Sequence, residues 1–140
     1  MSYFLYERRV AFSDTDAMSV VHHSNYLRYL EEARVAWMRD RGLLNTHFPR
    51  TDKVLAVTQF QVWHFRPARF DDALKIRLQA KRMGLRLRFE YAIYNGDERI
   101  AEAFTEHVPV NAELKPVKPD SRLTQTLEKE PWTETWLSNS

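Results

Sequence analysis

The chain has no cysteine among its 140 residues. Disulfide bonds, thiolate nucleophiles and cysteine-based zinc or iron–sulfur sites are therefore excluded. Glycine is also scarce: Gly42, Gly84 and Gly96 lie far apart, so the chain has no glycine-rich loop to hold a phosphate. The net charge of +2 is too small to indicate nucleic-acid binding, although a pI near 9.0 favours an anionic ligand.

Long apolar runs are missing too. The first nine residues lack the basic start and unbroken apolar stretch of a signal peptide, and no segment is typical of a membrane span. We therefore expect a cytoplasmic location, with no membrane span and no nucleic-acid partner. The length fits a single domain over residues 1–140, with a core at about residues 6–110 and a polar tail at residues 116–140.

Helical spacing begins at Ser24. The apolar positions that follow recur at i, i+4, i+7 and i+11 and form one stripe. Ser24 is a suitable N-cap, and Gly42 is suitable for a left-handed C-terminal cap. The pattern predicts a helix of about 16 to 18 residues, roughly 25 Å long. Its apolar stripe consists of Tyr26, Leu30, Ala33 and Trp37.

The remaining segments alternate between apolar and polar residues, as strands do. A loop through Pro49 and Asp52 precedes them, and Asn95-Gly96 predicts a two-residue hairpin turn. We expect an α+β fold in which four strands linked by hairpins form a meander after the helix. One helix covers little of such a sheet, which favours a homo-oligomer. The strands are predicted at residues 3–12, 54–66, 74–81, 85–94 and 99–110, with a short helix near residues 120–127.

Two carboxylates and two imidazoles lie close together just before the long helix. These are Asp14, Asp16, His22 and His23. The unpaired N–H groups and partial positive charge of a helix start stabilise an oxyanion that develops on a thioester carbonyl. Asp16 is placed either to attack that carbonyl or to take a proton from an attacking water, and the sequence leaves both routes open.

Two other interpretations of this segment are simpler. Asp14 and Asp16 are typical of Asx turns at a strand end, and the histidines are typical of polar loop residues near a cap. A metal site is the weakest interpretation, because His22, His23 and Asp16 lack the i, i+4 spacing that puts ligands on one helix face. No metal or redox cofactor is expected.

Two sequence blocks resemble the 4-hydroxybenzoyl-CoA thioesterase-like family, especially its Tol-Pal-associated acyl-CoA thioesterase branch. One is Asp14-Thr15-Asp16-Ala17 with Val20-Val21-His22-His23 and Tyr26, and the other is Arg66-Pro67-Ala68-Arg69-Phe70-Asp71-Asp72-Ala73-Leu74. The resemblance implies a hot-dog fold, an antiparallel sheet of about five strands wrapped around one long central helix. It implies that Asp16 is the catalytic carboxylate and that His23 contributes its backbone N–H, with its imidazole as a second candidate group, while Asp14 is structural. Substrate contacts are then expected from Val21, His22 and Tyr26.

The chain departs from this family pattern at three positions. Relatives often have tyrosine where this chain has Phe12, and glycine where it has Met18 and Ser19. The Phe12 side chain donates no hydrogen bond. If the tyrosine of the relatives orients substrate or water, another group such as His22 would have to do so in this chain. Bulk at Met18 and Ser19 would narrow the mouth of the site.

A basic run falls on the polar faces of two predicted neighbouring strands. Three of its members, Arg82, Arg86 and Arg88, are candidates for binding the phosphates of coenzyme A or an acidic acyl carrier protein. The alternative is a solvated sheet face that resists edge association. The full run is Lys75, Arg77, Lys81, Arg82, Arg86 and Arg88.

Together these features predict an enzyme that hydrolyses an acyl-CoA thioester to a free acid and CoA, as a homodimer or homotetramer. A hot-dog hydratase or dehydratase is a rival function. Such relatives are expected to pair an Asp and a His that lie closer together in the sequence, with a proline between them. No such proline separates Asp16 from His22 or His23 in this chain. The other rival is a nonenzymatic module whose basic patch binds an acidic protein or nucleic acid.

Overall fold

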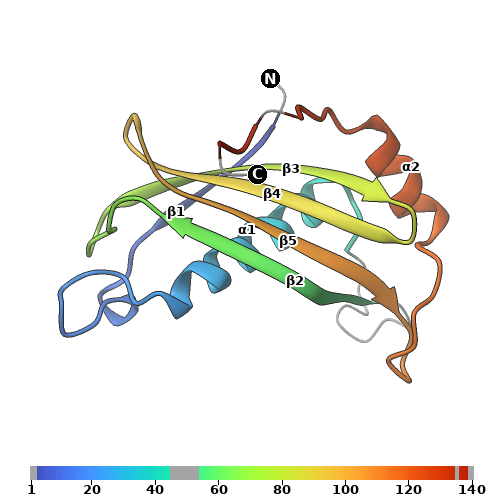
Figure 1. Cartoon of the computed structure of the whole chain (residues 1–140), viewed down its shortest axis with the longest axis horizontal. Coiled ribbons are helices and arrows are strands. Elements are labelled where there is room, and N and C mark those ends of the chain that lie inside the picture. The colour runs from blue at the N-terminus through green and yellow to red at the C-terminus, as the bar shows by residue number, and fades with distance from the viewer. Residues whose placement is uncertain (1–2, 45–53, 135, 139–140) are drawn as a thin grey trace.

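The computed structural model describes residues 3–44, 54–134 and 136–138 of the chain. Its centre is a five-stranded antiparallel sheet with the strand order β1-β3-β4-β5-β2, and α1 crosses one face of this sheet (Figure 1). The elements in chain order are β1 Phe4–Arg9, the 3-10 turn η1 Phe12–Asp14, α1 Ser24–Asp40, β2 Val54–His64, β3 Ala73–Met83, β4 Arg86–Asn95, β5 Glu98–Val110 and α2 Ser121–Lys129.

Helix α1 has 17 residues and begins at Ser24, which confirms the predicted length. Ser24 is nevertheless not its cap, because the structure places His23 at the N-cap position. The capping contact comes from His22 instead. Its Nδ1 accepts the Ser24 N–H at 3.2 Å and lies 2.8 Å from the Ser24 hydroxyl. The prediction of Ser24 as N-cap was therefore wrong by one position.

The C-terminal end of α1 follows the predicted pattern. Gly42 has φ +68, the left-handed conformation in which glycine carries no Cβ penalty. The Gly42 N–H donates to the Arg39 carbonyl at 3.1 Å, and the Leu43 N–H donates to the Met38 carbonyl at 2.8 Å. These two bonds form a Schellman motif, so the cap predicted at Gly42 is confirmed.

The predicted meander is only partly right. Strands β3, β4 and β5 are joined in that way, but β2 lies at the far edge of the sheet, antiparallel to β5, and β1 pairs with β3. Pro67 cannot donate to a ladder, and the segment around it carries the chain along the end of the sheet from β2 to β3 (Figure 1). The loop predicted through Pro49 and Asp52 lies outside the described residues.

Strand limits differ from the predictions by a few residues. β1 ends at Arg9, because the Val10 N–H bonds instead to the Asp72 carbonyl at 2.9 Å. Asn95 is the last residue of β4, opposite Glu98, so the turn is made by Gly96 and the residue after it. Gly96 has φ +61, and the helix predicted near residues 120–127 is confirmed as α2.

The hydrophobic core lies between α1 and the inner face of the sheet. The predicted helical stripe is buried there, and the alternating apolar residues of β3 and β4 face it. Truncating such a side chain costs about 2–5 kcal/mol, so this contact holds α1 against the sheet. The largest fully buried side chains include Trp37, Tyr29, Tyr91, Phe89, Leu30, Leu74, Ile76 and Leu78.

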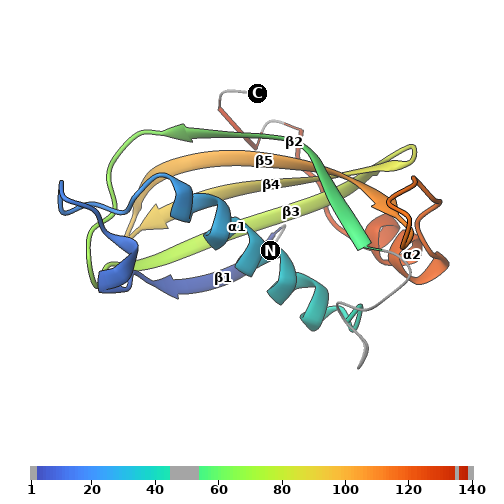
Figure 2. The same cartoon turned by 90° about the horizontal axis from the view of Figure 1, so that it is seen from below.

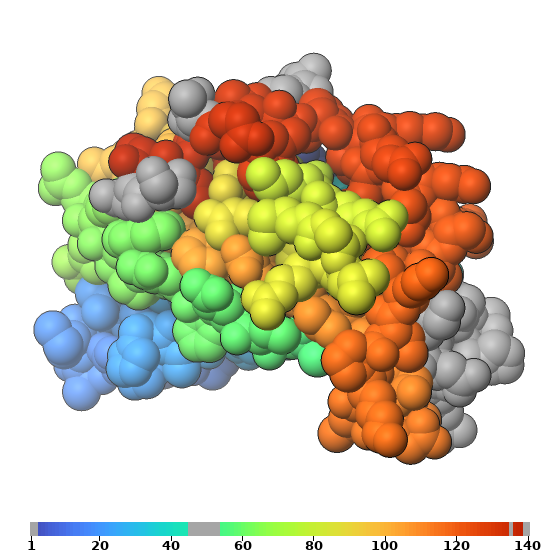
Figure 3. Space-filling view, turned by 45° about the vertical axis from the view of Figure 1, so that its right-hand side comes forward, coloured from blue at the N-terminus to red at the C-terminus, as the bar shows by residue number. Residues whose placement is uncertain are grey.

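The outer face of the sheet is less wet than the alternation predicted. The segment after α2 runs against it, and Figure 3 shows this segment in red above the yellow strands. The Gln79 amide donates to the Thr133 carbonyl and accepts the Thr133 N–H, both at 3.0 Å. Gln79 also donates to Glu90 at 2.8 Å, and both side chains are buried. In the described part of the chain, neither helix is long and apolar enough to cross a membrane.

Candidate active site

The loop before α1 folds into a small hairpin. The Asp16 N–H donates to the Val20 carbonyl at 3.0 Å, and the His22 N–H donates to the Asp14 carbonyl at 2.9 Å. Ser19 allows the turn between them with φ +64, where a glycine would be unstrained. The hairpin therefore holds Asp16 in a fixed register with the residues that start the helix.

Asp14 anchors this hairpin from below. Only 1% of it is exposed, and its carboxylate accepts hydrogen bonds from the Tyr29 hydroxyl at 2.7 Å and the Ala11 N–H at 2.9 Å, besides a contact with Arg28. Burial alone would raise the pKa of Asp14, but the hydrogen bonds from Tyr29, Ala11 and Arg28 outweigh burial and lower it. Asp14 is thus an ionised structural anchor rather than a reactive group.

Asp16 is in a different position. It is half-buried, and its Oδ1 accepts the Met18 N–H at 2.8 Å. Its Oδ2 makes no hydrogen bond with any residue that the structure describes. One carboxylate oxygen is thus fixed by the backbone while the other is open to an incoming group.

Most N–H groups at the start of α1 are already used. The His22 N–H donates to the Asp14 carbonyl at 2.9 Å. The Ser24 N–H is held by the His22 imidazole at 3.2 Å, and the Asn25 N–H donates to the His22 carbonyl at 2.9 Å. Among the described residues, the His23 N–H has no acceptor. This donor stays free at the positive end of the helix.

Val21 and Tyr26 bring the second sequence block to the loop. The Val21 N–H donates to the Ala68 carbonyl at 2.8 Å, and both Val21 and Tyr26 are buried. Burial raises the pKa of Tyr26, although a hydrogen bond with the Ala68 backbone opposes this. The two blocks that carry the family resemblance are thus in direct contact, and these two side chains form the wall behind the loop.

Sequence reasoning missed a third imidazole, His64 at the end of β2. Its ring meets the Tyr26 ring edge-on, with centroids 4.7 Å apart, and burial and the neighbouring His23 lower its pKa. The rings of His22 and His23 lie 4.1 Å apart. The sequence places His64 shortly before Pro67, near the predicted end of a strand. This position does not indicate that the end of β2 lies beside the start of α1.

The three predicted CoA-phosphate residues lie elsewhere in the chain. They belong to the β3–β4 hairpin, at the opposite end of the sheet from the loop before α1 (Figure 1). Arg88 is ion-paired with Glu90 at 2.9 Å and with Glu106 at 2.7 Å, whereas Arg82 and Arg86 are exposed. Within one chain, the structure does not bring these arginines together with Asp16.

The departures from the family pattern also have visible contacts. Phe12 is 77% exposed and packs edge-on against Phe70, with ring centroids 5.7 Å apart. Met18 is 78% exposed, so its side chain stands mostly in solvent. Neither side chain supplies a polar group to the loop. In the described part of the chain, no three acidic or imidazole side chains are grouped to hold a metal ion.

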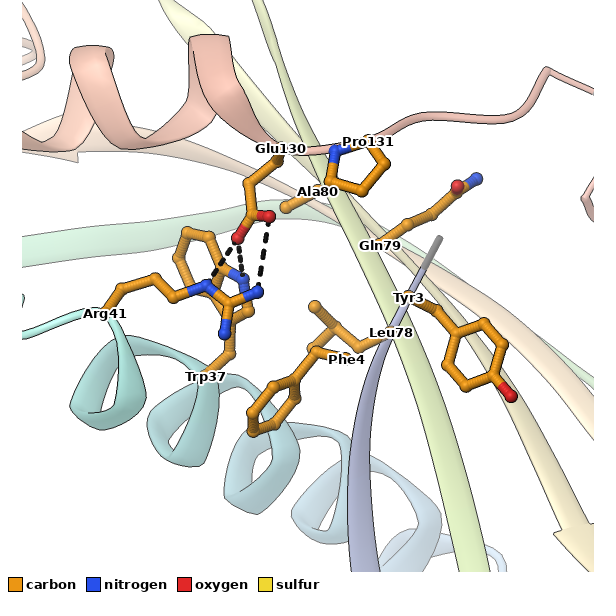
Figure 4. Close-up of a pocket in the computed structure, with 9 residues that line it drawn as sticks. All are labelled: Tyr3, Phe4, Trp37, Arg41, Leu78, Gln79, Ala80, Glu130 and Pro131. Carbon is orange, nitrogen blue, oxygen red and sulfur yellow. Dashed lines mark hydrogen bonds and ion pairs between the residues drawn. The ribbon is translucent and has the colours of Figure 1, made fainter. Parts of the chain in front are cut away.

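A cavity of about 180 Å³ lies at the other end of α1 (Figure 4). Glu130 projects into it and accepts hydrogen bonds from Trp37 Nε1 at 2.6 Å and from Arg41 Nε at 2.7 Å. These partners occupy the carboxylate. Trp37, Arg41 and Glu130 therefore form a polar clamp on one side of the cavity, and none of the residues that line the cavity belongs to the site around Asp16.

Comparison with known proteins identifies the family and the fold. The sequence pattern of the thioesterase-like superfamily matches residues 10–137 of the chain. The chain therefore belongs to the thioesterase-like superfamily. Solved structures of thioesterases share its fold, so the hot-dog fold and the enzyme class expected from the sequence are both confirmed.

Named relatives are similar over most of their length. The 1,4-dihydroxy-2-naphthoyl-CoA hydrolase of Thermosynechococcus vestitus is 32% identical over 106 residues, which cover 74% of this chain and 73% of the relative. The acyl-CoA thioester hydrolase YbgC of Escherichia coli O157:H7 is 31% identical over 98 residues, covering 69% and 73%. The structure of a 1,4-dihydroxy-2-naphthoyl-CoA thioesterase from Synechocystis has a TM-score of 0.82 at 26% identity and covers 91% of this chain and 96% of that one.

Proposed function

We propose that this protein hydrolyses an acyl-CoA thioester, with Asp16 as the reacting carboxylate and the His23 N–H as the donor to the thioester carbonyl. The observation that carries the proposal is the pairing of two unused groups on one fixed loop. Asp16 Oδ2 and the His23 N–H have no partners among the described residues, while the groups around them are bonded. An ionised oxygen and a preorganised donor are the two parts that acyl transfer needs.

The donor acts on the carbonyl oxygen of the substrate. As a nucleophile approaches the carbonyl carbon, negative charge develops on that oxygen, and the His23 N–H and the dipole of α1 stabilise this charge. Removing one such donor from other enzymes slows turnover about 10²–10³-fold. His22 supports this arrangement, because its imidazole accepts the Ser24 N–H and its carbonyl accepts the Asn25 N–H. The His23 N–H is then the donor that is left for the substrate.

Asp16 acts by one of two routes. As a nucleophile, its free oxygen bonds to the thioester carbon, the carbon–sulfur bond breaks, and water then hydrolyses the anhydride. As a general base, it takes a proton from the water that attacks the carbon directly. A single turnover in H₂¹⁸O tests for the anhydride: label in the Asp16 carboxylate with a label-free first product shows an anhydride that water opens at the aspartyl carbon. Label in the first product alone is the result of the general-base route and also of an anhydride that water opens at the acyl carbon.

His64 completes the proposed site from the β2 side. Burial and the neighbouring His23 lower the pKa of His64, which favours the neutral imidazole, and we propose that this ring accepts a proton beside His23. Val21 and Tyr26 are proposed to hold the substrate by shape, since both are buried behind the loop. The reaction is proposed to need no metal or redox cofactor, and turnover should therefore survive dialysis against a chelator.

The relatives point to the range of thioesters to try. Some are named for an aryl substrate, 1,4-dihydroxy-2-naphthoyl-CoA, and others for acyl-CoA in general. We propose the same range, aryl and acyl thioesters of coenzyme A, for this chain. An acyl carrier protein as the thiol carrier, membership of the Tol-Pal-associated branch and a cytoplasmic location stay predictions.

Association through β2 is proposed for the oligomer. β2 is an edge strand of the sheet. The backbone of an open edge is a template for a second strand, and a second copy of this chain supplies one. Sedimentation should give a dimer or a tetramer, and a monomer at micromolar concentration would contradict this. In such an oligomer, Arg82 and Arg86 of one chain would bind CoA phosphates only if they lie beside the Asp16 site of a partner chain.

The test is thiol release from a panel of aryl, short-chain and long-chain acyl-CoAs. Turnover of at least one member by the wild type is expected. No release from any member, together with salt-sensitive binding of an acidic protein, would favour the binding module. Hydration of an enoyl-CoA without thiol release would favour the hydratase.

A further inference from the structure

A row of polar side chains crosses the inner face of the sheet, where apolar residues are the rule. Tyr91 on β4 and Thr105 and His107 on β5 are 0%, 3% and 0% exposed. Arg34 reaches this row from α1 and is half-buried. We call these four residues the inner polar row.

Hydrogen bonds link the row from end to end. Arg34 Nη1 donates to the Tyr91 hydroxyl at 3.4 Å. The Tyr91 hydroxyl lies 2.7 Å from Thr105 Oγ1, which lies 2.8 Å from His107 Nε2. Arginine has only donors, so the arrangement that leaves no hydroxyl proton unpaired runs from Arg34 through Tyr91 and Thr105 to His107.

This order of donation assigns the tautomer of His107. Its Nε2 accepts the Thr105 proton, so a neutral ring carries its own proton on Nδ1. Burial, and then the charge of Arg34, lower the pKa of His107 to about 3, which keeps the ring neutral near pH 7. Nδ1 is buried and has no partner among the described residues. The row therefore ends in an unsatisfied N–H donor.

The other end of the row is also a donor. Arg34 forms no ion pair within the described part of the chain, and its contact with Tyr91 uses one of its five N–H groups. A half-buried guanidinium without a carboxylate attracts an anion or another oxygen acceptor. Both ends of the inner polar row thus lack the same thing, an acceptor oxygen.

An apolar surface runs beside the row. Val57 is paired with His107, and Phe60 with Thr105, so the side chains of each pair share the inner face of the sheet. Val57 and Phe60 are 49% and 51% exposed. Helix α1 crosses the sheet obliquely, as Figure 2 shows, which leaves this part of the inner face beyond its cover. Apolar walls beside directed donors are typical of a small-molecule subsite.

We propose that the inner polar row is the distal end of the acyl subsite and selects acyl groups that carry an acceptor oxygen, a hydroxyl, phenolate or carboxylate, far from the thioester. This inference rests on the proposed function. Arg34 lies ten residues after Ser24, about 15 Å along the helix, and its side chain leans back toward the helix start. The geometry therefore favours an oxygen about 10 Å beyond the thioester carbon.

The test compares two pairs of substrates that differ only in a distal oxygen. One pair is 2-naphthoyl-CoA and a hydroxylated 2-naphthoyl-CoA, and the other is octanoyl-CoA and the same chain with a terminal carboxylate. The wild type is expected to prefer the oxygenated member by at least about tenfold in kcat/KM for at least one pair, since each lost buried acceptor costs roughly a tenfold factor or more.

Variants then assign the preference to the row. Arg34→Met should remove it, and Thr105→Val, which keeps the shape but breaks the chain of donation, should reduce it about tenfold. Thr105→Ser should restore it. The same change outside the row, Thr126→Val on α2, is the matched control and should leave the preference intact. Melting temperatures confirm that each variant is folded.

The outcomes separate this inference from the proposed function. Turnover of both members of each pair at equal rates by the wild type would overturn the inference and leave the thioesterase intact. A preference that survives both Arg34→Met and Thr105→Val would also overturn it. Absence of turnover for every substrate would contradict the proposed function. In that case, calorimetry with the free acids still tests the row, and equal binding of oxygenated and plain acids would overturn the inference by itself.

Discussion

The two ends of α1 differ in whether their unpaired backbone groups find partners. At the C-terminal end, Gly42 and Leu43 donate back to the last carbonyls, and Glu130 accepts from Trp37 and Arg41. At the N-terminal end, the His23 N–H has no acceptor among the described residues. The difference shows which end stabilises the fold and which is free to bind, because an unused donor contributes to binding only when a ligand arrives.

The carboxylates at the two ends differ in the same way. Glu130 is 10% exposed at its side chain and has both oxygens bonded, by Trp37 and Arg41. Asp16 has one oxygen held by the Met18 N–H and the other open. Reactivity therefore follows from what the fold leaves unsatisfied, and four variants sharpen this contrast.

The largest effect is expected from Asp16→Asn. This change keeps the shape of the side chain but removes the charge, so kcat for thiol release should fall by about 10²–10⁴-fold, the range for a lost acid–base group. Glu130→Gln is the matched change at the other end and should leave kcat within about twofold. Equal losses in the two variants would break the comparison.

Next comes Asp14→Asn, at the anchor beneath the loop. It leaves Arg28 and Tyr29 without their buried anion, so the free energy of unfolding should drop by about 3 kcal/mol in urea titrations. Asp71→Asn is the control: its pair with Arg9 is 63% exposed on both sides, and it should change stability by less than about 1 kcal/mol. An unchanged stability in Asp14→Asn would contradict the anchoring role.

Glu130→Ala should act on stability alone. Removing this acceptor leaves the Trp37 N–H without a partner and leaves Arg41 with only its ion pair to Asp40 in the described part of the chain, which costs about 2 kcal/mol of unfolding free energy. Thermal and urea unfolding measure this cost, while thiol release should stay near the wild-type rate. A fall in kcat larger than the loss of folded protein would mean that the clamp also shapes the site.

The smallest effect concerns pH. His107 has a pKa of about 3 in the folded chain, against 6.5 in the unfolded chain. Between these values the unfolded state binds the extra proton, so stability is present above pH 6.5 and is lost as the pH falls. From pH 7 to 5.5 this residue should cost the wild type about 1 kcal/mol. Urea titrations of His107→Leu should show a flatter dependence, and an equal slope would contradict the buried neutral ring.

Local patterns predicted much of the fold. The apolar stripe and Gly42 gave α1 almost to the residue, and alternation located the strands. Strand order was not predictable in this way, because placing β2 beside β5 depends on contacts between segments far apart in the chain. The cap at Ser24 failed because the competing acceptor, the His22 imidazole, is a side chain that propensity does not consider.

In the candidate site too, residues from one contiguous segment were predictable and residues from distant strands were not. Asp16 and His23 were identified by the family resemblance of one contiguous segment, and their roles stay proposals. His64, Thr105 and His107 come from other strands, and only folding brings them to α1. The arginines of the β3–β4 hairpin were grouped because they fall on the polar faces of two neighbouring strands, but the acids that engage Arg88 come from β4 and β5.

The most direct test of the account compares His23→Pro with His23→Ala. The φ of His23 is −55, which proline adopts without strain, so proline removes the N–H while alanine removes only the imidazole. With equal melting temperatures, kcat of His23→Pro should be about 10²–10³-fold below that of His23→Ala. Equal kcat values for the two variants would contradict the claim that the free N–H at the start of α1 stabilises the reacting carbonyl.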